Sequence, residues 1–191
     1  MKQRLIVAIS GASGAVYGIR LLEILRADPD METHLVVSPA ARLTISQETD
    51  WRVNEVLALA DVVHSPDNVG APIASGSFVV AGMAVAPCSI KTLSAIAYSH
   101  AAELISRAAD VQLKEGRPLL LLVRETPLHV GHLRLMTRAA EMGAIIMPPV
   151  PSWYARPATP DEIVDSTVGR ALLRLGFDGS VYHRWRGLQS A

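Results

Sequence analysis

The sequence predicts an α/β fold in which a parallel sheet is covered by helices on both faces. Short apolar runs rich in β-formers alternate along the chain with segments of helical periodicity, which is the pattern of a doubly wound sheet. The first run passes through a glycine-rich turn into a helix, over Leu5–Gly18. The 191 residues are one domain's worth of chain. Because no repeat, low-complexity tract or linker divides them, we expect a single domain over residues 1–191.

The first half of the chain predicts two strands and three helices. The strands are the apolar runs Leu5–Ile9 and Thr33–Val37, and the helices are Val16–Arg26, Pro39–Glu48 and Asn54–Ala60. The segment His64–Ser77 then combines Pro, Gly, Ser and Asn and is the longest irregular stretch. Long irregular loops often carry function, so this one is a candidate active-site loop.

The second half continues the alternation of strands and helices. The last helix is amphipathic, and the strand before Arg124 is apolar throughout. In chain order the predicted elements are strand Met83–Ala86, helices Ile90–Tyr98 and Ala101–Lys114, strand Leu119–Val123, helix Leu133–Met142, strand Ala144–Met147 and helix Asp161–Leu175.

Polar and unusual residues gather directly after the predicted strands. In a doubly wound sheet these loops emerge along one edge, where ligands bind outside the strand carboxyl ends. Most polar side chains in these loops are hydroxyls, and Arg124 adds a positively charged guanidinium. We therefore expect a large ligand that bears a phosphate. The loops are Gly11–Gly14, Ser38–Pro39, Pro87–Thr92, Arg124–Pro127 and Pro148–Tyr154.

The turn after the first strand is typical of phosphate binding. Gly11 and Gly14 allow a tight turn and close approach, Ser10 and Ser13 offer hydroxyls, and the next helix presents its N-terminus. The turn lacks the G-x-G-x-x-G spacing of dinucleotide folds and the Lys-Ser/Thr ending of a Walker loop. The second strand ends at Ser38 rather than at an acidic residue that would grip a ribose. FMN therefore suits the pattern better than NAD.

The amino-acid composition limits the kinds of molecule that the chain is expected to bind. Hydrophobic residues make up 50% of the chain and the formal net charge is zero, so nothing favours nucleic acid or an anionic membrane. Excess apolar surface suggests burial between subunits. The single cysteine, Cys88, excludes an internal disulfide and fits a reducing cytoplasm. The run Leu5–Ile9 is too short for a signal peptide and no later run is long enough to span a bilayer.

Eight segments of the chain match the motifs of one known family, and they are Ser10–Gly14, Gln47–Asp50, Ala74–Ser77, Ala86–Ser94, Arg107–Glu115, Arg124–Leu128, Trp153–Pro157 and Arg184–Trp185. On these segments the whole chain resembles the UbiX-like flavin prenyltransferase family, formerly described as aromatic acid decarboxylases. Its motifs occur in the family's order and spacing. Two segments, Ala74–Phe78 and Arg184–Leu188, resemble in particular the branch paired with phenolic acid decarboxylases.

The resemblance implies a Rossmann-like, flavodoxin-like flavoprotein domain that binds FMN. It implies transfer of a dimethylallyl group from dimethylallyl phosphate to N5 and C6 of reduced FMN, with no metal. The prenylated FMN would be the cofactor of a separate aromatic or acrylic acid decarboxylase. A large homo-oligomer such as a dodecamer is also implied.

The resemblance also implies roles for individual residues. Glu48 and Glu125 would be the acid/base carboxylates, Ser13 would lie between flavin and substrate, and Trp185 would offer its π face to an allylic cation. The implied FMN contacts are Gly11, Ala12, Ser13, Ser38, Ser89, Thr92 and Arg124. The implied contacts of the prenyl phosphate are Arg107, Lys114, Arg124, Tyr154 and Arg170.

Simpler interpretations exist for several of these residues. Arg107 and Lys114 share one helix face and could form a surface charge ladder. Tyr154 could be a packing residue and Trp185 a subunit anchor.

The chain also departs from the family pattern, since Ser99 and Glu103 occupy places usually held by Gly and Asn, and Arg134-Leu135 replaces Glu-Asn. If that Asn touches flavin, the Glu103 carboxylate would alter the flavin's protonation or redox poise.

Two other functions fit the same fold. An FMN-dependent cysteine decarboxylase would need a clamp for the substrate carboxylate and an active-site histidine. A non-catalytic, flavin-carrying subunit of a decarboxylase complex would bind FMN tightly without turnover.

Overall fold

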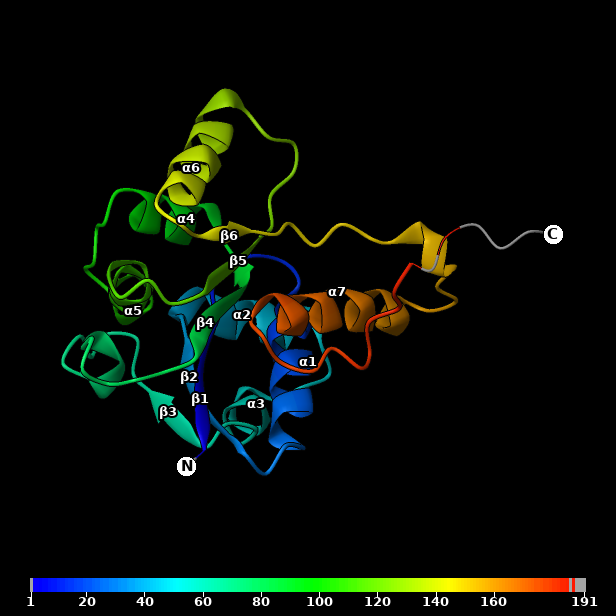
Figure 1. Cartoon of the computed structure of the whole chain (residues 1–191), viewed down its shortest axis with the longest axis horizontal. Coiled ribbons are helices and arrows are strands. Elements are labelled where there is room, and N and C mark those ends of the chain that lie inside the picture. Colours follow the sequence, from blue (N-terminus) through cyan, green and yellow to red (C-terminus); the bar gives the residue numbers. More distant parts are fainter. Residues whose placement is uncertain (1, 186, 188–191) are drawn as a thin grey trace.

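The computed structural model describes residues 2–185 and 187, and these residues form a six-stranded, fully parallel sheet between two layers of helices (Figure 1). The strand order is β3-β2-β1-β4-β5-β6. The chain therefore reverses direction across the sheet between β1 and β4, which is the switch point of a doubly wound fold. The strands are β1 (Gln3–Ile9), β2 (Met31–Val37), β3 (Val62–His64), β4 (Gly82–Cys88), β5 (Leu119–Val123) and β6 (Ile145–Ile146).

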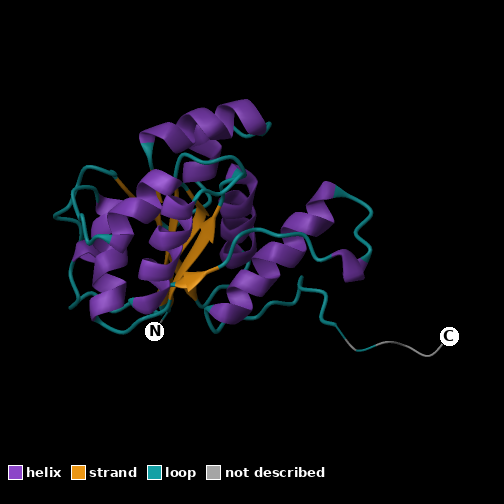
Figure 2. Ribbon diagram, turned by 90° about the horizontal axis from the view of Figure 1, so that it is seen from above, coloured by secondary structure: helices purple, strands orange, loops and turns teal. Residues whose placement is uncertain are grey.

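Helices cover both faces of the sheet (Figure 2). One face packs against α1 (Ala15–Arg26), α2 (Pro39–Glu48), α3 (Val53–Leu57) and α7 (Pro160–Arg174). The other packs against α4 (Ile90–Ala97), α5 (Leu104–Lys114) and α6 (Val130–Glu141). Two short 3₁₀ helices, η1 (Pro72–Ala74) and η2 (Trp153–Ala155), lie in the connecting loops.

The central strand β1 shows why its apolar run is continuous. Leu5, Val7 and Ile9 face one helical layer, while Ile6 and Ala8 face the other, and all five are fully buried. Successive side chains of a strand point to opposite faces, so a strand covered on both faces has no polar positions. This buried strand fixes the position of the loop that follows it.

The doubly wound parallel sheet predicted from the sequence is confirmed, with differences at some element boundaries. The edge strand β3 was missed because it has three residues, of which Val63 is exposed. The helix predicted from Leu133 begins earlier, at Val130, because the His129 side chain caps it by accepting the Gly131 N–H at 2.9 Å. The helix predicted from Ala101 begins later, at Leu104.

Two residues noted in the sequence, Ser99 and Cys88, have defined places in this framework. Ser99 has a φ of 51°, in the left-handed region that favours glycine, which accounts for the usual glycine at this place. Cys88 is fully buried, and burial raises the pKa of its thiol, so it is not a nucleophile.

Within residues 2–185 and 187, we find no helix with the length and apolar character needed to cross a membrane.

Candidate active site

A cavity of about 420 Å³ lies at the carboxyl edge of the sheet, beside the switch point. Its walls come from the loops after all of β1 to β5, together with Glu103 at the N-cap of α5, as the convergence of strand ends predicts. Pro66 and Asp67 belong to the irregular loop His64–Ser77 that the sequence marks as a candidate active-site loop. It is lined by Gly11, Ser38, Pro39, Ala40, Pro66, Asp67, Ser89, Ile90, Lys91, Thr92, Glu103 and Glu125.

Two helix N-termini open into this cavity. The Ser38 hydroxyl caps α2 by accepting the Ala41 N–H at 3.1 Å, and the Ser89 hydroxyl caps α4 by accepting the Thr92 N–H at 3.3 Å. Ser89 also donates to the Thr92 hydroxyl at 3.1 Å. Free N–H groups and the positive dipole ends of two helices favour an anion at this point.

The loop after β1 is shaped by close packing. A Cβ on Gly11 would stand 2.3 Å from the Cβ of Ala40, so only glycine lets α2 begin against this loop. The Ser10 hydroxyl donates to the Pro87 carbonyl at 2.9 Å and accepts the Ser89 N–H at 2.8 Å. Ser10 therefore joins β1 to β4, and the expectation that its hydroxyl serves a ligand is wrong.

The Glu48 carboxylate lies at the start of α1. It reaches from the end of α2 and accepts the Gly14 N–H at 2.7 Å, which places it next to the loop that carries Ser13. The positive end of the α1 dipole therefore already faces a negative charge, the Glu48 carboxylate. The helix N-termini left for a ligand phosphate are those of α2 and α4.

Arg124 and Glu125 follow β5 and are both exposed. The Arg124 N–H donates to the Cys88 carbonyl at 3.0 Å, which fixes the loop beside β4. The pKa of the Tyr17 hydroxyl is raised by burial, and the nearby positive charge of Arg124 opposes that rise. Tyr17, whose ring packs against Gly14, is a further residue near the site that sequence reasoning missed.

The departure at Glu103 is compensated within the cavity. Lys91 donates to the Glu103 carboxylate at 2.5 Å, so the negative charge is paired with an ammonium from α4. An isolated carboxylate would repel a bound phosphate, whereas this exposed ion pair contributes almost no net charge. Lys91 has no assigned role in the sequence because its partner Glu103 lies twelve residues away, at the N-cap of α5.

The second group of predicted residues lies on α5. Arg107 donates to the Ala74 carbonyl at 3.2 Å, and Lys114 donates to the Glu115 carboxylate at 2.6 Å. A helix that connects two parallel strands runs antiparallel to them. Lys114, in the last turn of α5 just before β5 begins at Leu119, therefore lies toward the amino edge of the sheet, opposite to the cavity.

The third group lies where η2, α7 and the C-terminal segment meet. The Tyr154 hydroxyl is 2.8 Å from the Tyr182 hydroxyl, and its ring packs edge-on against Trp185 with centroids 5.5 Å apart. The Arg170 guanidinium lies 5.5 Å from the centre of the Tyr182 ring. Figure 1 shows η2 and this end of the chain extending away from the sheet.

Within one chain, four of the seven predicted FMN contacts line the cavity, namely Gly11, Ser38, Ser89 and Thr92. The predicted phosphate contacts are divided. Arg124 is at the carboxyl edge, Arg107 and Lys114 are on α5, and Tyr154 and Arg170 line hollows distinct from the cavity between α2 and α4. The expected meeting of Lys114 with Tyr154 and Arg170 does not occur inside a single copy.

The switch-point cavity and its two helix N-termini define an α/β protein of the flavoprotein class, and the Flavoprotein family model matches residues 1–172. The flavin prenyltransferase UbiX of Escherichia coli K12 is 58% identical over 187 residues, which are 97% of this chain and 99% of that protein. The chain belongs to the flavin prenyltransferase family.

Two solved structures have nearly the same fold. The crystal structure of AnUbiX in complex with FMN and dimethylallyl pyrophosphate aligns with a TM-score of 0.96 and 46% identity, covering 99% of this chain and 100% of that one. A dodecameric FMN-dependent UbiX-like decarboxylase from Escherichia coli O157:H7 aligns with a TM-score of 0.95 and 46% identity, covering 97% and 100%.

Proposed function

We propose that this chain binds FMN in the cavity between α2 and α4 and transfers a dimethylallyl group to N5 and C6 of the reduced flavin. The observation that carries the proposal is the convergence of two serine-capped helix N-termini, at Ser38 and Ser89, on one cavity beside Gly11. These groups fit a flavin phosphate and its polyol chain. The 46% identical AnUbiX, solved with FMN and dimethylallyl pyrophosphate, supports it.

The residues at the carboxyl edge have distinct tasks in this proposal. Reduced FMN, when bound, supplies the nucleophilic atoms. The Arg124 guanidinium binds phosphate and neutralises charge as the leaving group departs. Glu48 and Glu125 accept and return the proton, with Ser13 between the two substrates. The loops also keep water from the allylic cation.

The residues on α5 and at the C-terminal end complete the site from other copies of the chain. Lys114 lies toward the opposite sheet edge from its own cavity, so it can act on a prenyl phosphate only in a neighbouring copy. Arg107, Tyr154 and Arg170 supply further donors, and the Trp185 ring stabilises the allylic cation. The dodecameric state of the similar E. coli O157:H7 protein supports an assembly of this kind.

The product is proposed to be the cofactor of a separate decarboxylase of aromatic or acrylic acids. The buried Cys88, the single cysteine of the chain, fits the reducing cytoplasm as the place of action.

Incubation with reduced FMN under anaerobic conditions tests the reaction. With dimethylallyl phosphate, and in a parallel sample with the pyrophosphate, the extracted flavin is expected to gain one five-carbon group by mass spectrometry. Omitting the donor is the control. If FMN is bound but no adduct forms with either donor, prenyl transfer is not the function.

The two other functions predict no prenylated flavin in this experiment and a different result in another one. Cysteine decarboxylation would release carbon dioxide from a cysteine-terminated peptide, but no histidine is among the described residues that line the cavity. A flavin-carrying subunit would retain FMN without turnover and would co-purify with a large partner.

A further inference from the structure

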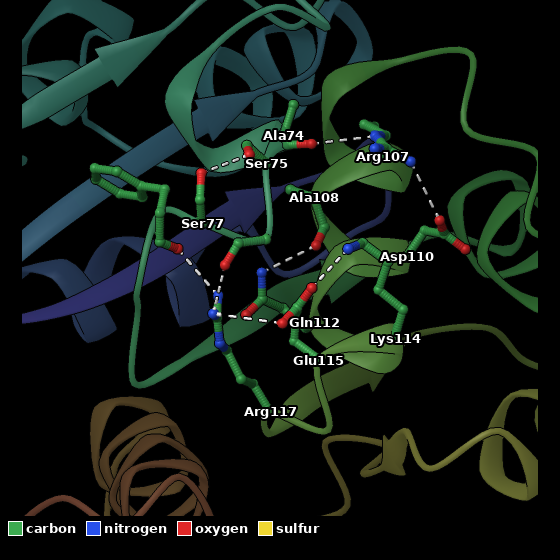
Figure 3. Close-up of polar contacts among 12 residues, drawn as sticks. Ala74, Ser75, Ser77, Arg107, Ala108, Asp110, Gln112, Lys114, Glu115 and Arg117 are labelled. Carbon is green, nitrogen blue, oxygen red and sulfur yellow. Dashed lines mark hydrogen bonds and ion pairs between the residues drawn. The ribbon is translucent and has the colours of Figure 1, made fainter.

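We propose that Gly76 and Glu115 are positioning residues that hold the Lys114 ammonium in place for the prenyl phosphate. This inference rests on the proposed phosphate-binding role of Lys114. It concerns the turn formed by the last residue of η1 and the four residues that follow it, residues 74–78, and the face of α5 on which this turn lies (Figure 3).

Two arginines fix the backbone of the turn. Arg107 donates to the Ala74 carbonyl at 3.2 Å. Arg117 donates to the Gly76 carbonyl at 2.7 Å and to the Phe78 carbonyl at 3.0 Å, and its side chain is only 16% exposed. Hydrogen bonds to a charged group are stronger than neutral ones, so three carbonyls of the turn are held firmly against α5.

Glu115 connects this fixed turn to Lys114. One carboxylate oxygen accepts from Lys114 Nζ at 2.6 Å, and the other lies 3.9 Å from Arg117 Nη2. The hydrogen bond from Lys114 lowers the pKa of Glu115, so the carboxylate stays ionised. A lysine side chain has many rotamers, and this contact selects one position for its ammonium.

Gly76 leaves the space in which the pair lies. A Cβ on Gly76 would stand 2.0 Å from Glu115 Oε1 and 2.8 Å from Lys114 Nζ. Both atoms are the ends of flexible side chains, and the φ of Gly76 lies outside the left-handed region. An added methyl group would therefore displace the Lys114–Glu115 pair rather than unfold the turn.

The test compares Gly76→Ala and Glu115→Gln with Lys114→Met in steady-state prenylation assays. Both positioning variants are expected to raise KM for dimethylallyl phosphate about tenfold, the equivalent of one charged hydrogen bond. The kcat, the KM for FMN and the melting temperature should stay near wild type. Adding Gly76→Ala to Lys114→Met should cause no further rise. Gly70→Ala is the matched control, because its Cβ would meet only Asn68 Oδ1, at 3.4 Å.

The outcomes separate this inference from the proposed function. If Lys114→Met raises KM while Gly76→Ala and Glu115→Gln leave it unchanged or lower it, the positioning role is overturned and prenyl transfer stands. If Lys114→Met also leaves KM unchanged, the inference fails together with the role of Lys114. Formation of prenylated flavin by the wild-type chain reports on the function independently of either result.

Discussion

Replacing Arg124 with alanine is expected to lower kcat/KM for prenyl transfer by about 10²–10³-fold, the loss typical of removing one preorganised donor at a developing charge. Arg124 follows β5 at the carboxyl edge, next to Glu125, which lines the cavity. Its side chain is exposed, and its structural contact is made by the backbone N–H to the Cys88 carbonyl. The substitution keeps that contact, so the effect should fall on catalysis rather than on folding.

The measurement is the rate of formation of prenylated flavin over a range of donor concentrations, with the melting temperature recorded for each variant. Arg174→Ala is the control, since Arg174 is an exposed arginine in the last turn of α7. A near wild-type kcat/KM in Arg124→Ala would remove this residue from the site, and an equal loss in both variants would point to a general charge effect.

Replacing Gly18 with alanine is expected to lower the free energy of unfolding by about 1–3 kcal/mol, the usual cost of overpacking. An added Cβ would stand 2.3 Å from the Ala86 carbonyl oxygen and 2.8 Å from Ile9 Cγ1. The carbonyl belongs to central strand β4, where the backbone cannot move aside without disturbing the sheet. The same clash would push α1 outward and shift the loop that carries Ser13.

Chemical denaturation at matched protein concentration measures this cost, with Gly70→Ala as the control. A transition midpoint for Gly18→Ala equal to that of the control would mean that α1 does not pack against β4 as closely as described.

The fold was largely predictable because the sheet is buried on both sides. The strand Leu119–Val123 was predicted with its observed limits, and β1 nearly so, because continuous apolar runs admit few other interpretations. The edge strand β3 pairs only with β2 and is partly exposed, so its three residues carry no such signal. The packing role of Gly18 depends on Ala86, far along the chain, which no local pattern reveals.

The candidate site was predictable in part for the same reason. Parallel strands end at one edge, so the sequence alone places Gly11, Ser38 and Ser89 together. Ser10 was misjudged because a hydroxyl that joins two strand ends looks in sequence like one that serves a ligand. The separation of Lys114 from the cavity follows from the direction of α5, but its proposed place in a neighbouring copy depends on assembly, which no local pattern reveals.

The proposed division of the site among copies of the chain is tested most directly by mixing two variants with complementary defects. An Arg124→Ala chain has a defective cavity but an intact Lys114, and a Lys114→Met chain has the reverse. After the two are dissociated and reassembled together, about a quarter of the sites should combine an intact cavity with an intact Lys114 from a neighbour, if copies mix at random. With dimethylallyl phosphate well below the KM of the wild-type chain, prenylated flavin should then form at a rate above that of either variant reassembled alone. If the mixed oligomers are no more active than the separate variants, Lys114 does not serve the cavity of another copy.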